Sequence, residues 1–225
     1  MNRLIDRLNP AKHRELIATG GLLVGFLIHN LIYPLASQGM VGAVVFYLLY
    51  AGLFPAATWL LVSDIRLRGL SLISGVVTFV FGLFYSQSGA GGAALGLYAA
   101  SVVYHLIMIG VLAYYTFARK NVLTEVLLAA TALFLIIGSA FGAIYALIEW
   151  LAPGSFAASD GTVLDWQQLL YFSYATLTTL GYGDITPKGF YAQAFAAFEA
   201  VVGVLYTVIL LARLVGLHAS QPESR

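Results

Sequence analysis

Six long apolar stretches constrain this chain more than any other feature. A helix needs about 20 mostly apolar residues to cross a bilayer, and a segment in hydrocarbon must satisfy its own backbone polar groups. Hydrophobic residues make up 60% of the sequence and charged residues 9%, whereas soluble domains carry about 25% charged residues. We therefore predict an all-α membrane protein with six spanning helices, at residues 16–35, 41–62, 70–86, 93–117, 122–151 and 191–217.

The basic residues predict how these spans are oriented. Cytoplasmic connections of membrane proteins carry an excess of Lys and Arg. Of the eleven such residues, Lys188 alone falls on the other side of the predicted spans. We therefore expect a multi-pass protein of the cell membrane with both termini in the cytoplasm. The residues on the cytoplasmic side are Arg3, Arg7, Lys12, Arg14, Arg66, Arg68, Arg119, Lys120, Arg213 and Arg225.

The composition also argues against several classes of function. The net charge of +1 gives no indication of a nucleic-acid partner. The sequence holds no cysteine, which excludes disulfides and thiolate metal sites. It shows no nucleophile–base pair, no cluster of metal ligands and no nucleotide-binding loop, so we expect neither an enzyme nor a cofactor.

The segment between the fifth and sixth spans, residues 152–189, differs from the rest of the chain. Residues 165–178 are apolar enough to enter a membrane and too short to cross it. Asp165 and Gln168 form the pattern of a helix N-terminal capping box. The next residues, 179–183, contain two glycines, and the chain then returns to the outer surface. Extended backbone at membrane depth is tolerated where it lines water or is buried in protein, so the pattern predicts a re-entrant pore segment.

This segment resembles a known family. The run TLTTLGYGDITP is similar to the signature of the potassium channel family, whose filter is usually written TVGYG. Over residues 178–184 it departs from that pattern once, with Leu180 in place of Val. The arrangement of helix, pore helix, filter and helix covers residues 122–217. The last helix also resembles the inner helix of prokaryotic members. The first four helices fit the six-helix architecture of the family in general.

The resemblance implies a selectivity filter at Thr179, Leu180, Gly181, Tyr182 and Gly183. In this family four copies of the loop place rings of backbone carbonyls around K⁺, replacing its hydration shell. The K⁺ ligands would then come from the first four of these residues. Glycine accepts the left-handed dihedrals that such a backbone requires. A ring of four loops from one loop per chain implies a closed homotetramer in the bilayer, with potassium as the transported ion.

Three further residues are candidate supports of this filter. Thr178 lies at the C-terminal end of the expected pore helix, where the helix dipole would favour a waiting cation. Asp184 directly follows the filter. Glu199 is a carboxyl group within a predicted span, which marks it as a functional candidate. It could brace the pore helix through hydrogen bonds or be a protonation site that alters filter gating. Because Ala175 stands where some relatives carry a carboxylate, bracing is expected from Glu199 or Asp184.

Glycines within the spans have two open interpretations. Gly203, midway along the sixth span, could be a gating hinge, because glycine lowers the cost of bending a helix. It could equally mark a close contact with the pore helix. The spacings Gly21-x-x-x-Gly25 and Gly138-x-x-x-Gly142 suit close helix packing, although such spacings are also common by chance.

The spans offer little that could sense voltage or pH. A voltage sensor needs several basic residues within the field, because each charge contributes about 2.3 kcal/mol per 100 mV. The fourth span contains none; Arg119 and Lys120 lie at its cytoplasmic edge. His29 and His105 could sense pH or bind a metal together, or each could simply be a hydrogen-bonded packing residue.

Together these patterns divide the chain into four parts. We expect a cytoplasmic segment at residues 1–15, a four-helix domain without a voltage sensor at 16–118, a pore domain at 119–218 and a short cytoplasmic tail at 219–225. The predicted function is passive, potassium-selective conduction without strong voltage gating. The alternatives are a less selective cation channel or transporter subunit, and a non-conducting regulatory membrane protein.

Overall fold

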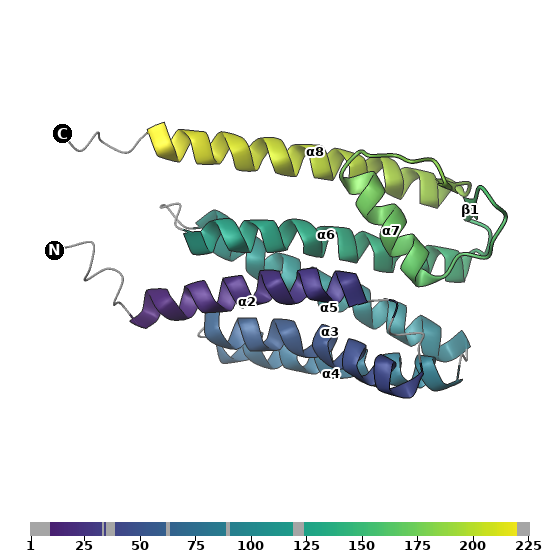
Figure 1. The fold of residues 1–225 in the computed structure, drawn as a ribbon, viewed down its shortest axis with the longest axis horizontal. Coiled ribbons are helices and arrows are strands. Elements are labelled where there is room, and N and C mark those ends of the chain that lie inside the picture. The colour runs from purple at the N-terminus through teal and green to yellow at the C-terminus, as the bar shows by residue number, and fades with distance from the viewer. Residues whose placement is uncertain are drawn as a thin grey trace. The chain divides into compact units, whose positions relative to one another are not determined.

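The computed structural model describes residues 10–32, 34, 39–61, 64–88, 91–118 and 124–219, and this part of the chain is mostly helical (Figure 1). Two three-residue strands accompany the helices. The elements are α2 (Pro10–Ile32), α3 (Met40–Leu61), α4 (Ile65–Ser88), α5 (Gly91–Ala118), α6 (Thr124–Leu151), β1 (Phe156–Ala158), α7 (Trp166–Leu177), β2 (Ile185–Pro187) and α8 (Phe190–Ala219).

Six of these helices, α2 to α6 and α8, are long and apolar enough to cross a membrane. The six predicted spans are therefore confirmed as helices of suitable length and composition. Helix α4 starts at Ile65, earlier than the predicted residue 70, so Arg66 and Arg68 belong to its first turns. Most of the predicted N-terminal segment and most of the predicted tail lie outside the described residues, with Arg3, Arg7 and Arg225. Arg119 and Lys120, between the fourth and fifth predicted spans, also lie outside them.

The chain divides into two compact units. The first contains α2 to α5 and the part of α6 up to Ile136. The second contains α6 from Ile137 onward, both strands, α7 and α8. Helix α6 thus contributes to both.

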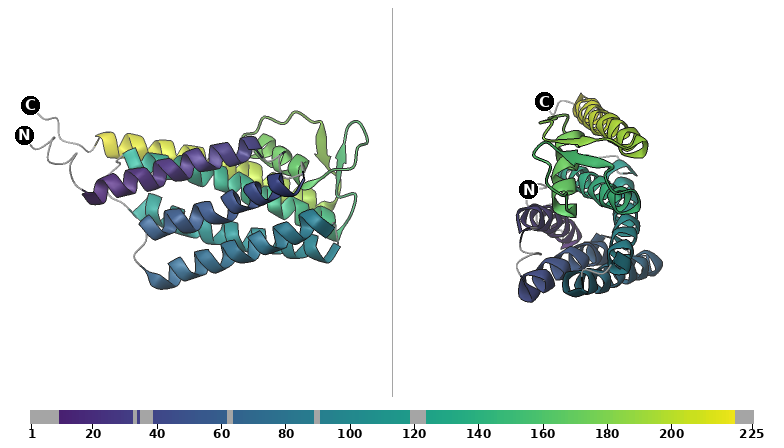
Figure 2. Two further views of the ribbon diagram at one scale, coloured as in Figure 1. Left: turned by 60° about the horizontal axis from the view of Figure 1, so that its bottom comes forward. Right: turned by 90° about the vertical axis from the view of Figure 1, so that its right-hand side faces the viewer.

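Glycines bring neighbouring helices of the first unit close together. Helix α3 packs against α2 and α4, and α4 packs against α5 (Figure 2). A Cβ atom at Gly75 of α4 would overlap the backbone carbonyl of Ala51 in α3, and one at Gly25 of α2 would overlap the Leu53 side chain. Gly21 has no atom within 4 Å of such a Cβ. Of the first predicted glycine pair, Gly25 is therefore the member in close contact.

In the second unit, helix α7 packs against both α6 and α8 (Figure 1). A Cβ at Gly138 would overlap the ring of Tyr174, and one at Gly142 would crowd Leu170. Both glycines of the second predicted pair thus face α7, the short helix, and allow its side chains to approach the α6 backbone. This contact holds α7 along the C-terminal half of α6.

The strands β1 and β2 form an antiparallel pair that the sequence did not predict. Phe156 pairs with Pro187, Ala157 with Thr186 and Ala158 with Ile185. The pairing ties the chain that leads into α7 to the chain that leaves the predicted filter. The segment that contains α7 and the predicted filter is therefore closed by hydrogen bonds between the strand before it and the strand after it.

Candidate functional site

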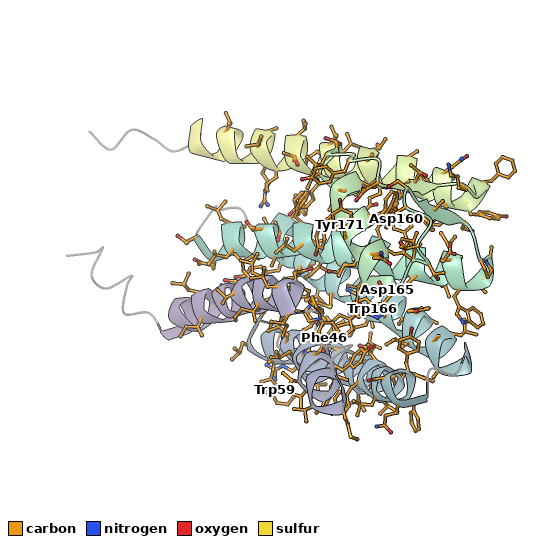
Figure 3. All side chains as sticks on the ribbon, turned by 45° about the vertical axis from the view of Figure 1, so that its right-hand side comes forward. Phe46, Trp59, Asp160, Asp165, Trp166 and Tyr171 are labelled. Carbon is orange, nitrogen blue, oxygen red and sulfur yellow. The ribbon has the colours of Figure 1, made fainter. Side chains whose placement is uncertain are left out.

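Helix α7 is a short helix with a well-defined start. The Asp165 side chain accepts a hydrogen bond from the Gln168 amide at 2.9 Å, and the Gln168 side chain accepts one from the Asp165 amide at 3.0 Å. The predicted capping box is therefore present, and Figure 3 shows Asp165 beside Trp166 at this end of the helix. The helix has 12 residues, which gives a length of about 18 Å, well short of the roughly 30 Å of a hydrocarbon core.

The backbone after α7 alternates between two conformations. Thr179, Gly181 and Gly183 have positive φ angles of 57°, 58° and 78°. Every second residue is thus in the left-handed region, as the sequence suggested for the two glycines. Thr179 was not expected there, and it is the one non-glycine residue with a positive φ in the described part of the chain. An alternation of this kind allows successive carbonyl groups to turn toward the same side of the chain.

The amide groups of the same run point back to the end of α7. The amide of Thr179 donates to the Thr176 carbonyl at 2.9 Å, and the amides of Leu180 and Gly181 both donate to the Ala175 carbonyl, at 2.8 and 3.2 Å. No hydrogen bond to a carbonyl oxygen of residues 179–183 is found within the described chain. Across a trans peptide bond the amide of one residue and the carbonyl of the residue before it point in opposite directions. The carbonyls of Thr178, Thr179 and Leu180 therefore face away from the end of α7, where these amides are bonded.

Tyr171 links α7 to the residue that follows this run. Its hydroxyl donates to the Asp184 carboxylate at 2.8 Å, and its ring stacks on that of Tyr182 with centroids 6.2 Å apart. The hydrogen bond to Asp184 raises the pKa of Tyr171 to about 12, so the hydroxyl stays protonated and donating near neutral pH. Tyr171, labelled in Figure 3, was not identified from the sequence. Its position on α7 is the one feature of the sequence that could have suggested a contact with Asp184.

Further hydrogen bonds hold the strand pair and the residues beside it. The Asp184 carbonyl accepts the Ser159 amide at 2.7 Å. Glu149, in the last turn of α6, accepts the amides of Gly154 and Phe156 at 2.7 and 3.0 Å. A carboxylate that accepts two amide hydrogen bonds is a strong anchor. It fixes the start of β1, and through the strand pairing it fixes the residues after the candidate filter.

Glu199 lies at the centre of a buried hydrogen-bonded group that joins three helices. Its two carboxyl oxygens contact the Tyr145 hydroxyl of α6 and the Ser173 hydroxyl of α7, each at 2.5 Å. The Ser173 oxygen also lies 2.7 Å from the Gly138 carbonyl oxygen. The side chains of Glu199, Tyr145 and Ser173 are fully buried. The sequence singled out Glu199 and did not identify Tyr145 or Ser173.

Thr178 ends α7, and Gly203 of α8 lies against the same end of that helix. The Thr178 hydroxyl and amide each bond the Tyr174 carbonyl, at 2.6 and 3.1 Å, so this residue closes the last turn of the helix. A Cβ at Gly203 of α8 would overlap the backbone carbonyl of Leu177. Of the two interpretations of Gly203, this geometry supports close packing against the short helix, and it leaves a hinge role untested.

His29 and His105, for which joint pH sensing or metal binding was one of two interpretations, lie in the first unit around Tyr50. His29 stacks on Tyr50 with centroids 5.0 Å apart, and within the described residues neither of its ring nitrogens has a hydrogen-bond partner. His105 lies with its Nδ1 atom 2.7 Å from the Ser101 carbonyl and 3.2 Å from the Tyr50 hydroxyl. In the described residues no group of three or more metal-ligating side chains occurs.

The part of the chain that contains the candidate filter is similar to known proteins. Residues 121–218 match a family model described as an ion channel. A two pore potassium channel c of Oryza sativa subsp. japonica is 40% identical over 63 residues, which is 28% of this chain and 14% of that protein. A two-pore potassium channel 2 of Arabidopsis thaliana is 39% identical over 70 residues, 31% of this chain and 15% of that protein.

A third relative is human. Potassium channel subfamily K member 17 of Homo sapiens is 41% identical over 44 residues, covering 20% of this chain and 13% of that protein. The chain thus matches about a seventh of the length of each of these relatives. No solved structure matches the chain significantly.

The fold and these similarities define the class of protein. Its apolar helices and potassium channel relatives make the chain a multi-pass membrane protein. The part of it that contains α6, α7, the candidate filter and α8 is similar to an ion channel family and to potassium channels.

Proposed function

We propose that this chain is one subunit of a homotetrameric, potassium-selective channel that conducts passively across the cell membrane. Its filter is Thr179, Leu180, Gly181, Tyr182 and Gly183, and the carbonyls of the first four bind K⁺. Four such loops around one axis form stacked rings of oxygen atoms that replace the hydration shell of the ion. The potassium channel relatives support this assignment because the potassium channel signature lies within the part of the chain that matches the ion channel family.

The observation that carries the proposal is the backbone of the filter run. Left-handed φ angles at Thr179, Gly181 and Gly183 alternate with residues whose φ is not positive, and the amides of residues 179–181 are bonded to the end of α7. This geometry supports a row of carbonyls that face away from α7 and can bind an ion. A cation without its water shell needs several such oxygens, and a single loop supplies them from one side.

Exposed apolar side chains support assembly with further copies. Leu180 and Tyr182 are 56% and 65% exposed in the single chain. Helix α8 also exposes a series of large apolar residues, which would be covered by neighbouring subunits around a fourfold axis. They are Phe190, Tyr191, Phe198, Val201, Val204, Leu205, Val208, Ile209 and Leu211.

The proposal includes orientation and gating. Both termini lie in the cytoplasm, following the basic residues of the inner connections. Opening is not strongly voltage-dependent, because α5 carries no Lys or Arg between Gly91 and Ala118. Thr178, Asp184 and Glu199 support the filter from α7, the outer loop and α8.

The test is barium-sensitive potassium flux into liposomes that contain the purified protein, with Gly181→Ala as the main variant. Alanine at φ +58° costs about 1–2 kcal/mol, and the strain should turn the carbonyl out of line. Gly110→Ala is the matched control, because Gly110 has no positive φ and no atom within 4 Å of an added Cβ. We expect Gly181→Ala to abolish flux or selectivity in intact tetramers.

Each alternative gives a distinct result. Reversal potentials that fail to separate K⁺ from Na⁺ in the wild type would point to a less selective cation channel. Wild-type liposomes without flux would favour a regulatory subunit. Equal, selective flux from wild type and Gly181→Ala would refute the filter assignment.

A further inference from the structure

The buried group around Glu199 has fewer hydrogen-bonding protons than contacts if the Glu199 carboxyl group is charged. Ser173 has one hydroxyl proton and lies 2.7 Å from the Gly138 carbonyl and 2.5 Å from a Glu199 oxygen. A backbone carbonyl accepts and cannot donate. If Glu199 is ionised, it also accepts and cannot donate, so the single Ser173 proton must serve two acceptors.

A neutral Glu199 resolves this count of protons. Its own proton can go to the Ser173 oxygen, which then gives its proton to the Gly138 carbonyl. The other Glu199 oxygen still accepts from the Tyr145 hydroxyl. Each of the three contacts then has one proton and one acceptor, which is the arrangement that buried polar groups need.

The surroundings favour the neutral form for a second reason. Tyr145 is the titratable group that faces Glu199 from α6, and α7 contributes the uncharged Ser173. No Lys, Arg or His contacts the Glu199 carboxyl group within the described residues. A buried carboxylate without a cation is costly. The ring of Tyr145 further packs on Phe156 and Phe172, with centroids 5.2 and 5.3 Å apart, which makes this region apolar.

We propose that Glu199 is a protonated carboxylic acid that positions the filter by linking α6, α7 and α8 through Tyr145 and Ser173. This inference rests on the proposed function for its consequence and on the hydrogen-bond geometry for the protonation. The link meets α7 at Ser173, which lies two residues before Ala175, and the Ala175 carbonyl receives the filter amides. A shift of α7 at Ser173 would therefore move the filter backbone. Loss of the Glu199 proton should weaken the link, so the link is intact at low and neutral pH and fails as pH rises.

The test combines a direct measurement of the proton with potassium flux. Infrared difference spectra of wild type against Glu199→Gln should show a carboxylic acid C=O band at neutral pH that disappears at high pH. Glutamine can donate from its amide nitrogen to Ser173 and accept from Tyr145. Selective potassium flux of the wild type should decline at high pH, whereas Glu199→Gln should retain selective flux without this decline. Glu199→Ala, Ser173→Ala and Tyr145→Phe should lose selectivity. Thr131→Val is the control, because its hydroxyl bonds only within α6 in the described chain.

The outcomes separate this proposal from the proposed function. An absent acid band, or Glu199→Gln behaving like Glu199→Ala, would overturn it. A pH-dependent decline that persists in Glu199→Gln would assign the titration to Tyr145 and also overturn it. If Glu199→Gln does not assemble, the pH titration of the wild type tests the proposal. The carboxylic acid band and the potassium selectivity must then decrease over the same pH range. Wild-type protein without potassium flux would refute the channel, and the infrared band would still decide the protonation.

Discussion

The hydroxyl of Tyr171 donates to the carboxylate of Asp184 at 2.8 Å, so that α7 is bonded to the residue that directly follows the candidate filter. The Tyr171 ring also stacks on Tyr182 within the filter. This pair restrains the C-terminal end of the run, and the amide bonds to the Ala175 carbonyl hold its N-terminal end.

Tyr171→Phe should loosen the outer end of the filter while keeping the ring stack on Tyr182. A hydrogen bond to a charged group contributes about 1.5–3 kcal/mol when buried and less at an exposed position such as this one. We expect faster loss of potassium current during sustained conduction, with tetramers intact. Tyr114→Phe, at an exposed tyrosine of α5, is the matched control. Identical current decay in both variants would show that this bond does not stabilise the filter.

The sequence predicted the elements whose causes are local. Span length depends on consecutive apolar residues, and the start of α7 depends on Asp165 and Gln168, three residues apart. The glycines at 181 and 183 mark left-handed backbone for the same reason, since their freedom is a property of the residue itself.

The contacts that position α7 could not be predicted because they depend on how the helices face one another. Tyr145 and Glu199 are 54 residues apart, and Ser173 and Glu199 are 26 apart. A single sequence gives the face of each helix and not the rotation of one helix against another. The β1–β2 pairing was missed for a similar reason, because each strand has three residues and neither shows a clear alternating pattern.

Glu149→Gln should release the start of β1. Glu149 accepts the amides of Gly154 and Phe156 with separate oxygens, and glutamine has one accepting oxygen, so one amide loses its partner. The cost is about 1–3 kcal/mol if the amide of the buried Phe156 loses it, and less at the exposed Gly154. Hydrogen exchange at these two amides should accelerate.

Asp160→Asn is the control for Glu149→Gln. Asp160 accepts from the amide and hydroxyl of Thr162 in the same loop, and within the described residues its side chain makes no hydrogen bond to β1. It should leave exchange at Phe156 unchanged. Equal acceleration in the two variants would mean that the loop responds to lost charge in general.

Voltage should have little effect on conduction. Helix α5 contains no Lys or Arg between Gly91 and Ala118, and a steep response needs several charges that each contribute about 2.3 kcal/mol per 100 mV. Open probability in planar bilayers should therefore change only weakly between opposite voltages in symmetric potassium. A gating charge of several elementary charges per subunit would contradict this prediction.

Gly203→Ala should destabilise the tetramer, because the added methyl group would overlap the backbone carbonyl of Leu177. Backbone cannot rotate away as a side chain can, and overpacking of this kind costs about 1–3 kcal/mol. Gly216→Ala is the matched control in the same helix, since nothing lies within 4 Å of its added Cβ. Alanine there should be neutral or stabilising by up to about 1 kcal/mol.

Thermal dissociation of the tetramer, measured beside single-channel opening, separates the two interpretations of Gly203. If Gly203 is a packing residue, the dissociation temperature falls in Gly203→Ala and rises or stays constant in Gly216→Ala. If it is a hinge and nothing else, Gly203→Ala changes opening while the dissociation temperature matches that of Gly216→Ala. The contact with Leu177 favours the first result, because α8 cannot bend at this point without moving the carbonyl at the end of α7.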